Sequence, residues 1–328
     1  MRILNAGTLA LALLAFVPES AAAAPASAGK LEMMTLSYVL GNGTHWDIDT
    51  AIDEGFFRDE GFATQTVAFT STPQAMQLLV SGAIDTSALE PEGLINAMVH
   101  GATDVAAIAQ QEFRPDWMLV AQPTIKTWAD LKGKRVGLSA LTTAEMWLTR
   151  KLFVKHGFGN ADWVGIQVGT SPAKFAALTN GSIAAAVLFQ PLALKAMEKG
   201  FQGLAPFAEV GDYPPTLIPV RRSWAAKNQN GIRFSRVIAR AHRWLYDSKN
   251  RAAALKIVET HTKCTPAQAA ALYKSFITDK LYTPAGAIDL HGVKNVLALM
   301  AENGQLPAGK AMTPEDLVLA KKDGGLWH

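Results

Sequence analysis

Two spacings of apolar residues alternate along the chain. Runs in which every second residue is apolar indicate strands, and runs in which apolar residues recur every three or four positions indicate helices. In the first third, the patterns predict strands over 35–40, 64–69, 84–88, 104–110 and 117–121, with helices over 47–60, 73–81 and 91–101 between them. Strands that alternate with helices are typical of the α/β class, in which helices cover both faces of a mainly parallel sheet.

The clearest of these units is the strand over 134–138 and the helix that follows it. Thr142 and Glu145 have the spacing of a capping box, in which a hydroxyl and a carboxylate bind free N–H groups at a helix start. Ser139 and Thr143 add further hydroxyls at the same point. Because the N–H groups and the dipole of a helix start favour negative charge, we expect an anion-binding corner here. An ordinary capped helix is the alternative.

An internal repeat extends this picture to two lobes. Residues 72–85 and 171–184 each begin with a hydroxyl residue and a proline, continue as a short helix, and end at a glycine before an Ile-led strand. Glu90 and Gln190, each followed by proline, then open a further helix. In open α/β sheets a ligand binds where helices begin, beyond the carboxyl ends of the strands. Two such lobes facing each other predict a binding cleft between them.

The second half of the chain is predicted to be mostly helical. Strands are expected over 204–209 and 216–221, and the second of them should rejoin the first lobe. Helices are expected over 222–228, 232–247, 249–261, 265–278 and 286–303. The Gly- and Pro-rich residues 304–328 are predicted to be extended or a loose tail.

The N-terminal residues have the pattern of a secretory signal. Arg2 supplies a positive charge, residues 6–17 form an apolar run, and small residues follow over 20–29. The apolar run is too short to cross a bilayer. We expect residues 1–28 to be a cleaved signal peptide. Because no cysteine lies near the cleavage region, a lipid anchor is not expected.

The composition of the chain mainly excludes certain classes of partner and site. The net charge of the 328-residue chain is only +3 and its charges are mixed, which gives no reason to expect a nucleic-acid partner. A single cysteine, Cys264, excludes an internal disulfide framework and a thiolate metal cluster. One histidine and two aspartates over residues 45–49 are too few to predict a metal site. Neither a metal nor another cofactor is therefore expected.

Five stretches, taken by their order and spacing, resemble a known family. They are AIDEGFFRDEGF (51–62), SGAIDTSALEPEGLINAMVHG (81–101), IKTWADLKGKRVGL (125–138), QPLALKAMEKG (190–200) and WLYDSKNRAAALKIV (244–258). They are similar to solute-binding proteins of ABC import systems, in the NMT1/THI5-like group that binds nitrate, alkanesulfonates, taurine and pyrimidine precursors. The resemblance spans about residues 33–306.

The resemblance implies a fold, a location and partners. The fold is the two-lobe periplasmic-binding-protein fold (type II), in which two crossover strands join α/β lobes that close on a ligand. Residues 29–122 and 216–328 should form lobe 1, and residues 123–215 lobe 2. The expected protein is a periplasmic monomer, not an enzyme, that delivers a small-molecule ligand to an ABC permease and ATPase encoded elsewhere. No GxxxxGK[ST] phosphate loop occurs, so the chain itself is not expected to be the ATPase.

The candidate ligand-binding residues lie in loops and at helix starts. The resemblance places the ligand at the loop after the first strand, which here contains Asn42, Thr44, His45 and Trp46. The helix starts and the repeat add Ser71, Thr72, Glu90, Ser139, Thr142, Thr143 and Gln190. Trp46 is expected to wall the pocket or stack on the ligand, and a position in the core is its alternative. No catalytic residue is predicted.

The hydroxyls and helix starts suit an oxyanion, whereas Glu90 would repel a pure anion. The leading prediction is therefore a small organic anion or zwitterion, similar to a sulfonate or taurine. A pyrimidine-like or aromatic heterocycle is the alternative ligand. A pyrimidine-synthase-like enzyme is an alternative function, but such enzymes rely on a cysteine-rich stretch and this chain has one cysteine. A sensor that presents its ligand to a membrane receptor is a further alternative.

Overall fold

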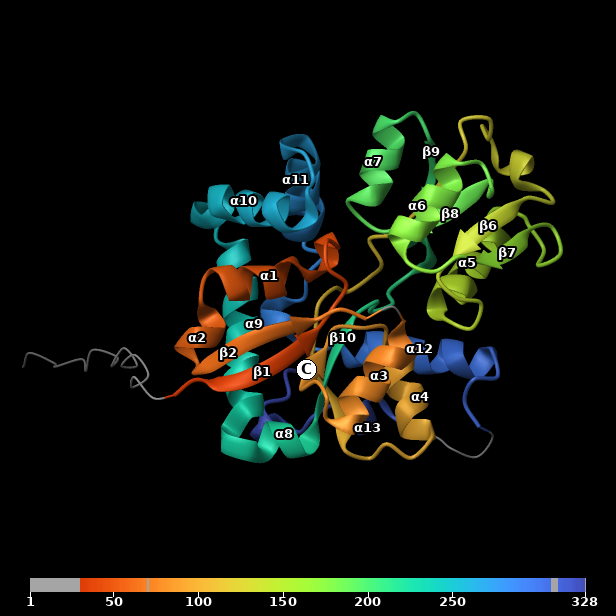
Figure 1. Ribbon diagram of the computed structural model, residues 1–328. Coiled ribbons are helices and arrows are strands. Elements are labelled where there is room, and N and C mark those ends of the chain that lie inside the picture. The colour runs from red at the N-terminus through yellow and green to blue at the C-terminus, as the bar shows by residue number, and fades with distance from the viewer. Residues whose placement is uncertain (1–29, 70, 308–311, 328) are drawn as a thin grey trace, which may run out of the picture.

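The computed structural model describes residues 30–69, 71–307 and 312–327. Two five-stranded sheets lie in two separate lobes, each covered by helices (Figure 1). We call the lobe of the first sheet lobe 1 and that of the second sheet lobe 2. The expected signal peptide lies outside the described residues. Within them, no helix is both long enough and apolar enough to cross a membrane.

The first sheet has the order β2-β1-β3-β10-β4. Its strands are β1 (Glu32–Ser37), β2 (Phe62–Val67), β3 (Thr86–Ser87), β4 (Val105–Gln110) and β10 (Leu217–Arg221). β1 pairs in parallel with β2 and β3, and β10 pairs antiparallel with β3 and β4. The expectation that the strand over 216–221 rejoins lobe 1 is therefore confirmed. β4 is buried along its whole length, which explains its nearly continuous apolar sequence.

The second sheet has the order β7-β6-β8-β5-β9. Its strands are β5 (Met118–Ala121), β6 (Arg135–Leu138), β7 (Val164–Gln167), β8 (Ala185–Leu188) and β9 (Gln202–Pro206). β6 pairs in parallel with β7 and β8, and β5 pairs antiparallel with β8 and β9. β7 was not predicted, because this short edge strand has no fully buried residue and shows no clear apolar alternation.

The strand over 117–121 was assigned to the wrong half of the molecule. We expected it to complete the first half, whereas β5 lies in the sheet of lobe 2. The chain thus crosses between the lobes before Met118, not after residue 122, and crosses back before Leu217. An apolar run such as MLVA can be buried in either sheet, and its own pattern does not indicate which partner strands it will join.

The helices of lobe 1 surround its sheet and extend above it (Figure 1). They are α1 (Trp46–Asp53), α2 (Phe56–Asp59), α3 (Thr72–Ser81), α4 (Pro91–Val99), α8 (Arg222–Ala226), α9 (Asn230–Tyr246), α10 (Arg251–Thr262), α11 (Pro266–Tyr273), α12 (Leu290–Glu302) and α13 (Pro314–Leu317). The helix expected over 47–60 is divided into α1 and α2 by Gly55, whose φ of 73° lies in the left-handed region.

The helices of lobe 2 are α5 (Ala144–Lys155), α6 (Ser171–Thr179) and α7 (Leu192–Glu198). The predicted repeat is confirmed by the connections: α3 joins β2 to β3 just as α6 joins β7 to β8, at equivalent places in the two sheets. Both helices have proline in their first turn and are followed by a glycine with positive φ, Gly82 and Gly181. The two lobes therefore present equivalent helix starts to each other.

The predicted loose tail is wrong for residues 312–327. The Leu319 N–H donates to the Ala107 carbonyl at 2.8 Å, and the Leu326 N–H donates to the Ile108 carbonyl at 2.9 Å. Leu317, Val318 and Leu319 are buried. The segment covers β4, which would otherwise be an unprotected edge of the first sheet. Its glycines and prolines led to the prediction of a loose tail. A segment can cover the edge of a sheet, however, without forming a regular helix or strand.

A candidate ligand-binding site between the lobes

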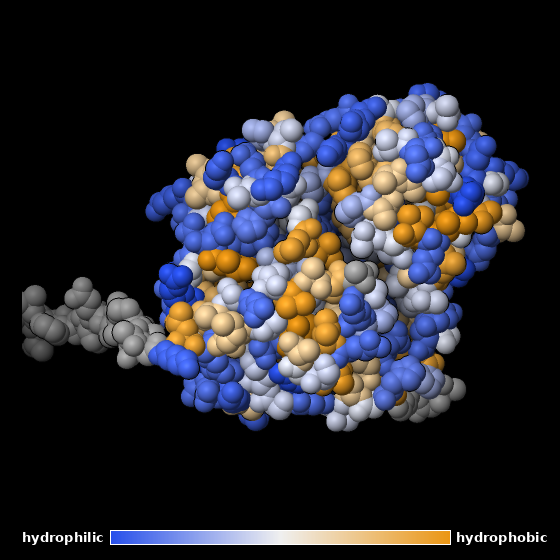
Figure 2. Space-filling model, viewed as in Figure 1, coloured by the Kyte–Doolittle hydropathy of each residue, from blue (hydrophilic) through white to orange (hydrophobic). Residues whose placement is uncertain are grey.

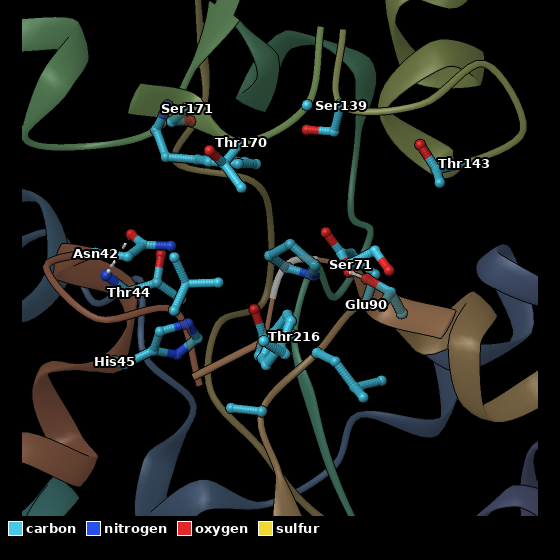
Figure 3. Close-up of a pocket in the computed structure, with 18 of the residues that line it drawn as sticks. Asn42, Thr44, His45, Ser71, Glu90, Ser139, Thr143, Thr170, Ser171 and Thr216 are labelled. Atoms are coloured by element: carbon cyan, nitrogen blue, oxygen red, sulfur yellow. Dashed lines mark hydrogen bonds between the residues drawn. The ribbon is translucent and has the colours of Figure 1, made fainter. Parts of the chain in front are cut away.

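A cavity of about 210 Å³ lies between the two lobes. Lobe 1 lines it with the loop after β1 and the starts of α3 and α4, and lobe 2 with the loop after β6 and the start of α6. Thr216 on the second crossing segment also lines the cavity, on the same side as His45 and Glu90 (Figure 3). The space-filling view shows the furrow between the lobes, with apolar residues on both of its sides (Figure 2). The site thus lies beyond the carboxyl ends of parallel strands, as expected for an open α/β sheet.

The structure brings together all the candidate residues except Trp46. The cavity is lined by Asn42, Thr44, His45, Ser71, Thr72, Glu90, Ser139, Thr142, Thr143 and Gln190. In Figure 3, Ser139, Thr143, Thr170 and Ser171 lie on one side and face the residues of lobe 1. Pro73 and Pro172, the repeated prolines, also line the cavity, so the two halves of the repeat meet at one site.

Trp46 lies in the core and not in the cavity wall. Its side chain is fully buried, and its ring contacts the Tyr273 ring edge-on at a centroid distance of 6.2 Å. It belongs to an apolar cluster formed with α10 and α11. The expectation that Trp46 stacks on the ligand is therefore wrong. At the first position of α1, the side chain is covered by the C-terminal helices, whose packing the sequence pattern did not reveal.

Three aromatic residues that the sequence did not single out supply the apolar part of the wall. Phe69, Trp117 and Phe189 line the cavity, and the Trp117 and Phe189 rings lie edge-to-face at 5.2 Å. Phe189 could have been found, because it immediately precedes Gln190 as Leu89 precedes Glu90 in the repeat. Trp117 was hidden because we placed it in a strand of the first half.

His45 is buried and hydrogen-bonded on the side away from the cavity. Its Nδ1 lies 2.9 Å from Gln111 Oε1, and Gln111 Nε2 donates to Asp47 Oδ1. The Tyr38 ring contacts the imidazole edge-on at 5.5 Å. Burial lowers the pKa of His45 below its usual value, so the ring is neutral at pH 7. It therefore brings a hydrogen-bonding nitrogen to the cavity without a positive charge.

Glu90 is the acidic side chain of the cavity wall. It is the N-cap residue of α4, and the Thr72 hydroxyl donates to its Oε2. Burial raises the pKa of this carboxyl above its usual value, because a carboxylate is poorly solvated there. Among the described residues that line the cavity there is no lysine or arginine. A ligand that donates hydrogen bonds or carries positive charge would therefore stabilise the ionised form of Glu90.

The predicted anion corner at the start of α5 is already filled by carboxylates of the protein. The Ser139 N–H and hydroxyl donate to Glu145 at 2.9 and 2.6 Å, and the Ala144 N–H donates to Glu92. The Lys174 ammonium pairs with both Glu145 oxygens at 2.8 and 2.9 Å. Both side chains of this pair are buried.

The prediction of a capping box at this helix start is also wrong. Thr143, not Thr142, is the N-cap residue, and it makes no side-chain cap hydrogen bond. Glu145 turns instead towards Lys174, because a buried ammonium requires a partner of opposite charge. The donors of this helix start are therefore less available to an anionic ligand than the sequence suggested.

The lobes are in contact on both sides of the cavity. On one side the Gly43 N–H donates to the Gln190 carbonyl at 3.2 Å, and Gln268 Nε2 donates to Glu198 Oε2 at 2.5 Å. On the other side the Ala144 N–H of lobe 2 donates to Glu92 of lobe 1. These contacts hold the two walls together around the cavity.

Two lobes with the same order of parallel strands, joined by two crossing segments around a cavity, define the periplasmic-binding-protein fold. The alkanesulfonate-binding protein SsuA from Xanthomonas axonopodis pv. citri bound to MOPS is similar, with a TM-score of 0.69 at 18% identity over 85% of this chain and 96% of that one. The periplasmic nitrate-binding protein NrtA from Synechocystis PCC 6803 has a TM-score of 0.70 at 14% identity over 86% and 84%.

Within this class the chain belongs to the NMT1-like family, whose sequence profile matches residues 29–259. A relative from Brucella abortus (strain 2308), named "Putative binding protein BAB2_1146", is 25% identical over 281 residues, which cover 84% of this chain and 76% of that protein. The resemblance inferred from the five sequence stretches is confirmed, and so is the two-lobe fold that it implied.

Proposed function

We propose that this protein is the solute-binding component of an ABC importer. It captures a small organic solute between its lobes and delivers it to a permease and an ATPase encoded elsewhere. The observation that carries the proposal is the cavity enclosed by both lobes, with hydrogen bonds between the lobes on both of its sides. In this proposal the protein acts in the periplasm as a monomer, and residues 1–28 are the signal that exports it.

Binding and closure are coupled in this mechanism. A solute that contacts Asn42 and Glu90 of lobe 1 together with Ser139 and Ser171 of lobe 2 can make all of its contacts only when the lobes are together. It therefore binds the closed form more tightly than an open one and shifts the population towards it. The closed form is the one that a permease can distinguish from the free protein.

The proposed solute is a small zwitterion, similar to an aminosulfonate, that carries a nitrogen donor as well as an anionic group. Glu90 in the wall and the lack of lysine and arginine among the described lining residues disfavour a pure oxyanion. The nitrogen donor would bind at Glu90. The anionic group would bind at the starts of α3 and α6, where Ser71 and Ser171 lie. An alkanesulfonate-binding protein shares the fold, which is consistent with a solute of this kind.

An aromatic nitrogen heterocycle is the second candidate. It is favoured by one specific observation, the aromatic side chains of Phe69, Trp117 and Phe189 in the cavity wall. Such side chains stack on flat rings or contact them edge-on. For such a ligand, Trp117 and Phe189 would take the stacking role that was expected of Trp46.

A thermal-shift and scattering experiment tests the proposal. The mature protein is screened against taurine, alkanesulfonates, nitrate, aromatic carboxylates, pyrimidines and a neutral sugar. A micromolar ligand at millimolar concentration should raise the free energy of unfolding by about 4 kcal/mol. The same ligand should reduce the radius of gyration in solution scattering. An unchanged radius at saturation would count against lobe closure, and a shift with nitrate or the sugar alone would contradict the zwitterion.

Glu90→Gln tests the acidic contact. The variant should weaken binding of an amine-bearing solute by roughly 1.5–3 kcal/mol, because a charge-assisted hydrogen bond is lost. It should leave binding of an anion without an amine unchanged or stronger. Glu54→Gln is the matched control, because Glu54 is exposed and does not line the cavity. Equal losses for both kinds of solute would show that Glu90 does not contact the amine.

A further inference from the structure

Three residues of the cavity wall are each hydrogen-bonded to the protein, and at two of them, His45 and Ser139, the partners fix the direction of the bond. They are His45 in the loop after β1, Ser139 in the loop after β6, and Glu90 at the start of α4. Ser139 lies on the lobe 2 side of the cavity, and His45 and Glu90 lie on the opposite side (Figure 3). The direction of each bond decides whether the residue donates to a ligand or accepts from it.

The direction at His45 is decided by a buried carboxylate. Asp47 Oδ1 accepts from the Ile48 N–H at 2.8 Å, and its Oδ2 lies 2.9 Å from His242 Nε2. Because a carboxylate accepts, Gln111 directs its amide N–H group to Asp47 and its Oε1 to His45. His45 Nδ1 must then carry the proton.

A neutral imidazole carries one proton, so Nε2 of His45 is left with a lone pair. No described residue forms a hydrogen bond with this nitrogen, and His45 lines the cavity. His45 is therefore an acceptor towards a ligand. Gln111 does not line the cavity, yet it determines this property.

Ser139 is an acceptor for a similar reason. Its hydroxyl donates to Glu145 Oε2 at 2.6 Å and accepts from the Lys174 ammonium at 3.0 Å. An ammonium only donates and its partner carboxylate only accepts, so the hydroxyl proton cannot turn towards the cavity without breaking the bond to Glu145. What remains for a ligand is one lone pair.

The donors of the wall are other residues. Asn42 Oδ1 accepts from the Thr44 N–H at 3.1 Å, which leaves the amide N–H group of Asn42 free to donate (Figure 3). Ser171 Oγ accepts from the Phe189 N–H at 3.3 Å, which leaves its O–H free to donate. The acceptors and the donors of the cavity are thus assigned to different side chains.

We infer that the solute is held through its own N–H groups by His45 Nε2, Ser139 Oγ and the Glu90 carboxylate, and that Gln111 is the positioning residue that makes His45 an acceptor. This inference rests on the proposed function and specifies its ligand. The solute has a nitrogen-rich end, an ammonium, an amidinium or an amino-substituted ring, and its acceptor groups face Asn42 and Ser171. A solute with acceptors only would place lone pairs against lone pairs at His45 and Ser139.

The first test needs no ligand. In ¹⁵N-histidine NMR spectra of the free protein at pH 7.5, His45, assigned by its absence from a His45→Asn variant, should show the Nδ1–H tautomer. Gln111→Met should shift the ring towards the other tautomer. Gln110→Met is the matched control, because Gln110 is equally buried but is hydrogen-bonded to Glu112 and Asp289 instead. An Nε2–H tautomer in the wild-type protein, or no change in Gln111→Met, overturns the inference.

The second test uses matched probes in calorimetric titrations: taurine with ethanesulfonate, 4-aminobutyrate with butyrate, and benzamidine with acetophenone. The nitrogen-bearing member should bind about 10-fold more tightly or better, because its partner leaves buried acceptors without a donor. In Gln111→Met this ratio should fall several-fold, and in Gln110→Met it should not. Failure of every nitrogen-bearing probe to bind overturns the inference.

The two proposals fail in different ways. Ethanesulfonate that binds as tightly as taurine and compacts the protein would overturn the inference while supporting solute capture by lobe closure. Compaction with none of the solutes in the thermal-shift screen would contradict the proposed function, whereas the wrong His45 tautomer contradicts the inference alone.

Discussion

At the level of single residues, the cavity wall takes its chemistry from side chains that do not line it. Lys174 and Glu145 form a buried ion pair whose members both bind Ser139. Gln111 sets the proton position on His45. A buried ion pair adds little stability by itself, but it can hold a neighbouring hydroxyl in one orientation. Changes at such positions should therefore alter ligand preference without a direct contact to the ligand.

Trp46→Ala should destabilise the fold rather than the complex. The side chain is fully buried, so its removal should lower the free energy of unfolding by about 3–5 kcal/mol. Chemical denaturation of the ligand-free protein measures this loss. Phe189→Ala is the comparison, because Phe189 lines the cavity. This substitution should reduce the free energy of solute binding more than the free energy of unfolding. If Trp46→Ala weakens solute binding and leaves the free energy of unfolding unchanged, Trp46 would be a residue of the cavity wall and not of the core.

At the level of secondary-structure elements, local signals located the helix starts well and the strand partners poorly. The prolines that begin α3 and α6 and the glycines that follow them are short-range features, and both were recognised. The partners of β5 and the edge position of β7 depend on residues far away in the chain. No local pattern could supply them.

The segment after α12 gives a prediction at this level. Removal of residues 312–328 should strip the cover from β4 and expose its edge, so the truncated protein should melt at a lower temperature and aggregate more readily. Leu319→Ala tests the same packing. It should lower the free energy of unfolding by about 2–5 kcal/mol, because Leu319 is buried. Lys322→Ala is the control, because the Lys322 side chain is exposed. If the truncated protein is as stable as the full chain, the prediction that these residues form a loose tail would be supported.

At the level of the whole molecule, a buried carboxylate joins the two lobes beside the cavity. Glu92 on α4 of lobe 1 accepts the Ala144 N–H at the start of α5 in lobe 2. Burial, reinforced by the nearby Glu90 charge, raises the pKa of Glu92 from 4.5 to about 7. The folded protein therefore binds this proton more tightly than the unfolded chain does. The stability that the protonated group contributes is complete below pH 4.5 and is lost as the pH rises through about 7.

Glu92→Gln should remove this pH dependence. Glutamine is neutral and can still accept the Ala144 N–H, so the variant should exceed the wild-type protein in stability above pH 7 by up to about 3 kcal/mol, and match it near pH 4.5. Denaturation curves between pH 4.5 and 8 measure the difference. Because burial also raises the pKa of Asp116 to about 7, the difference between the two proteins is the relevant quantity. Parallel stability curves would show that Glu92 does not titrate there.

Local sequence patterns were enough to predict the α/β class, the two-lobe repeat and most of the polar residues that line the cavity. These follow from features encoded within a few residues: the apolar period, a proline at a helix start, a glycine after its end. In both lobes the helix starts face the same cleft, so finding the starts located the cavity.

What those residues can do depends on contacts between distant parts of the chain. Lys174 reaches Glu145 across 29 positions and His45 reaches Gln111 across 66, and these contacts close the anion corner and turn Ser139 and His45 into acceptors. The same kind of distant packing placed Trp46 in the core and residues 312–327 against β4. The direction of a buried hydrogen bond depends on which partner the fold brings to it, and no local pattern records that partner.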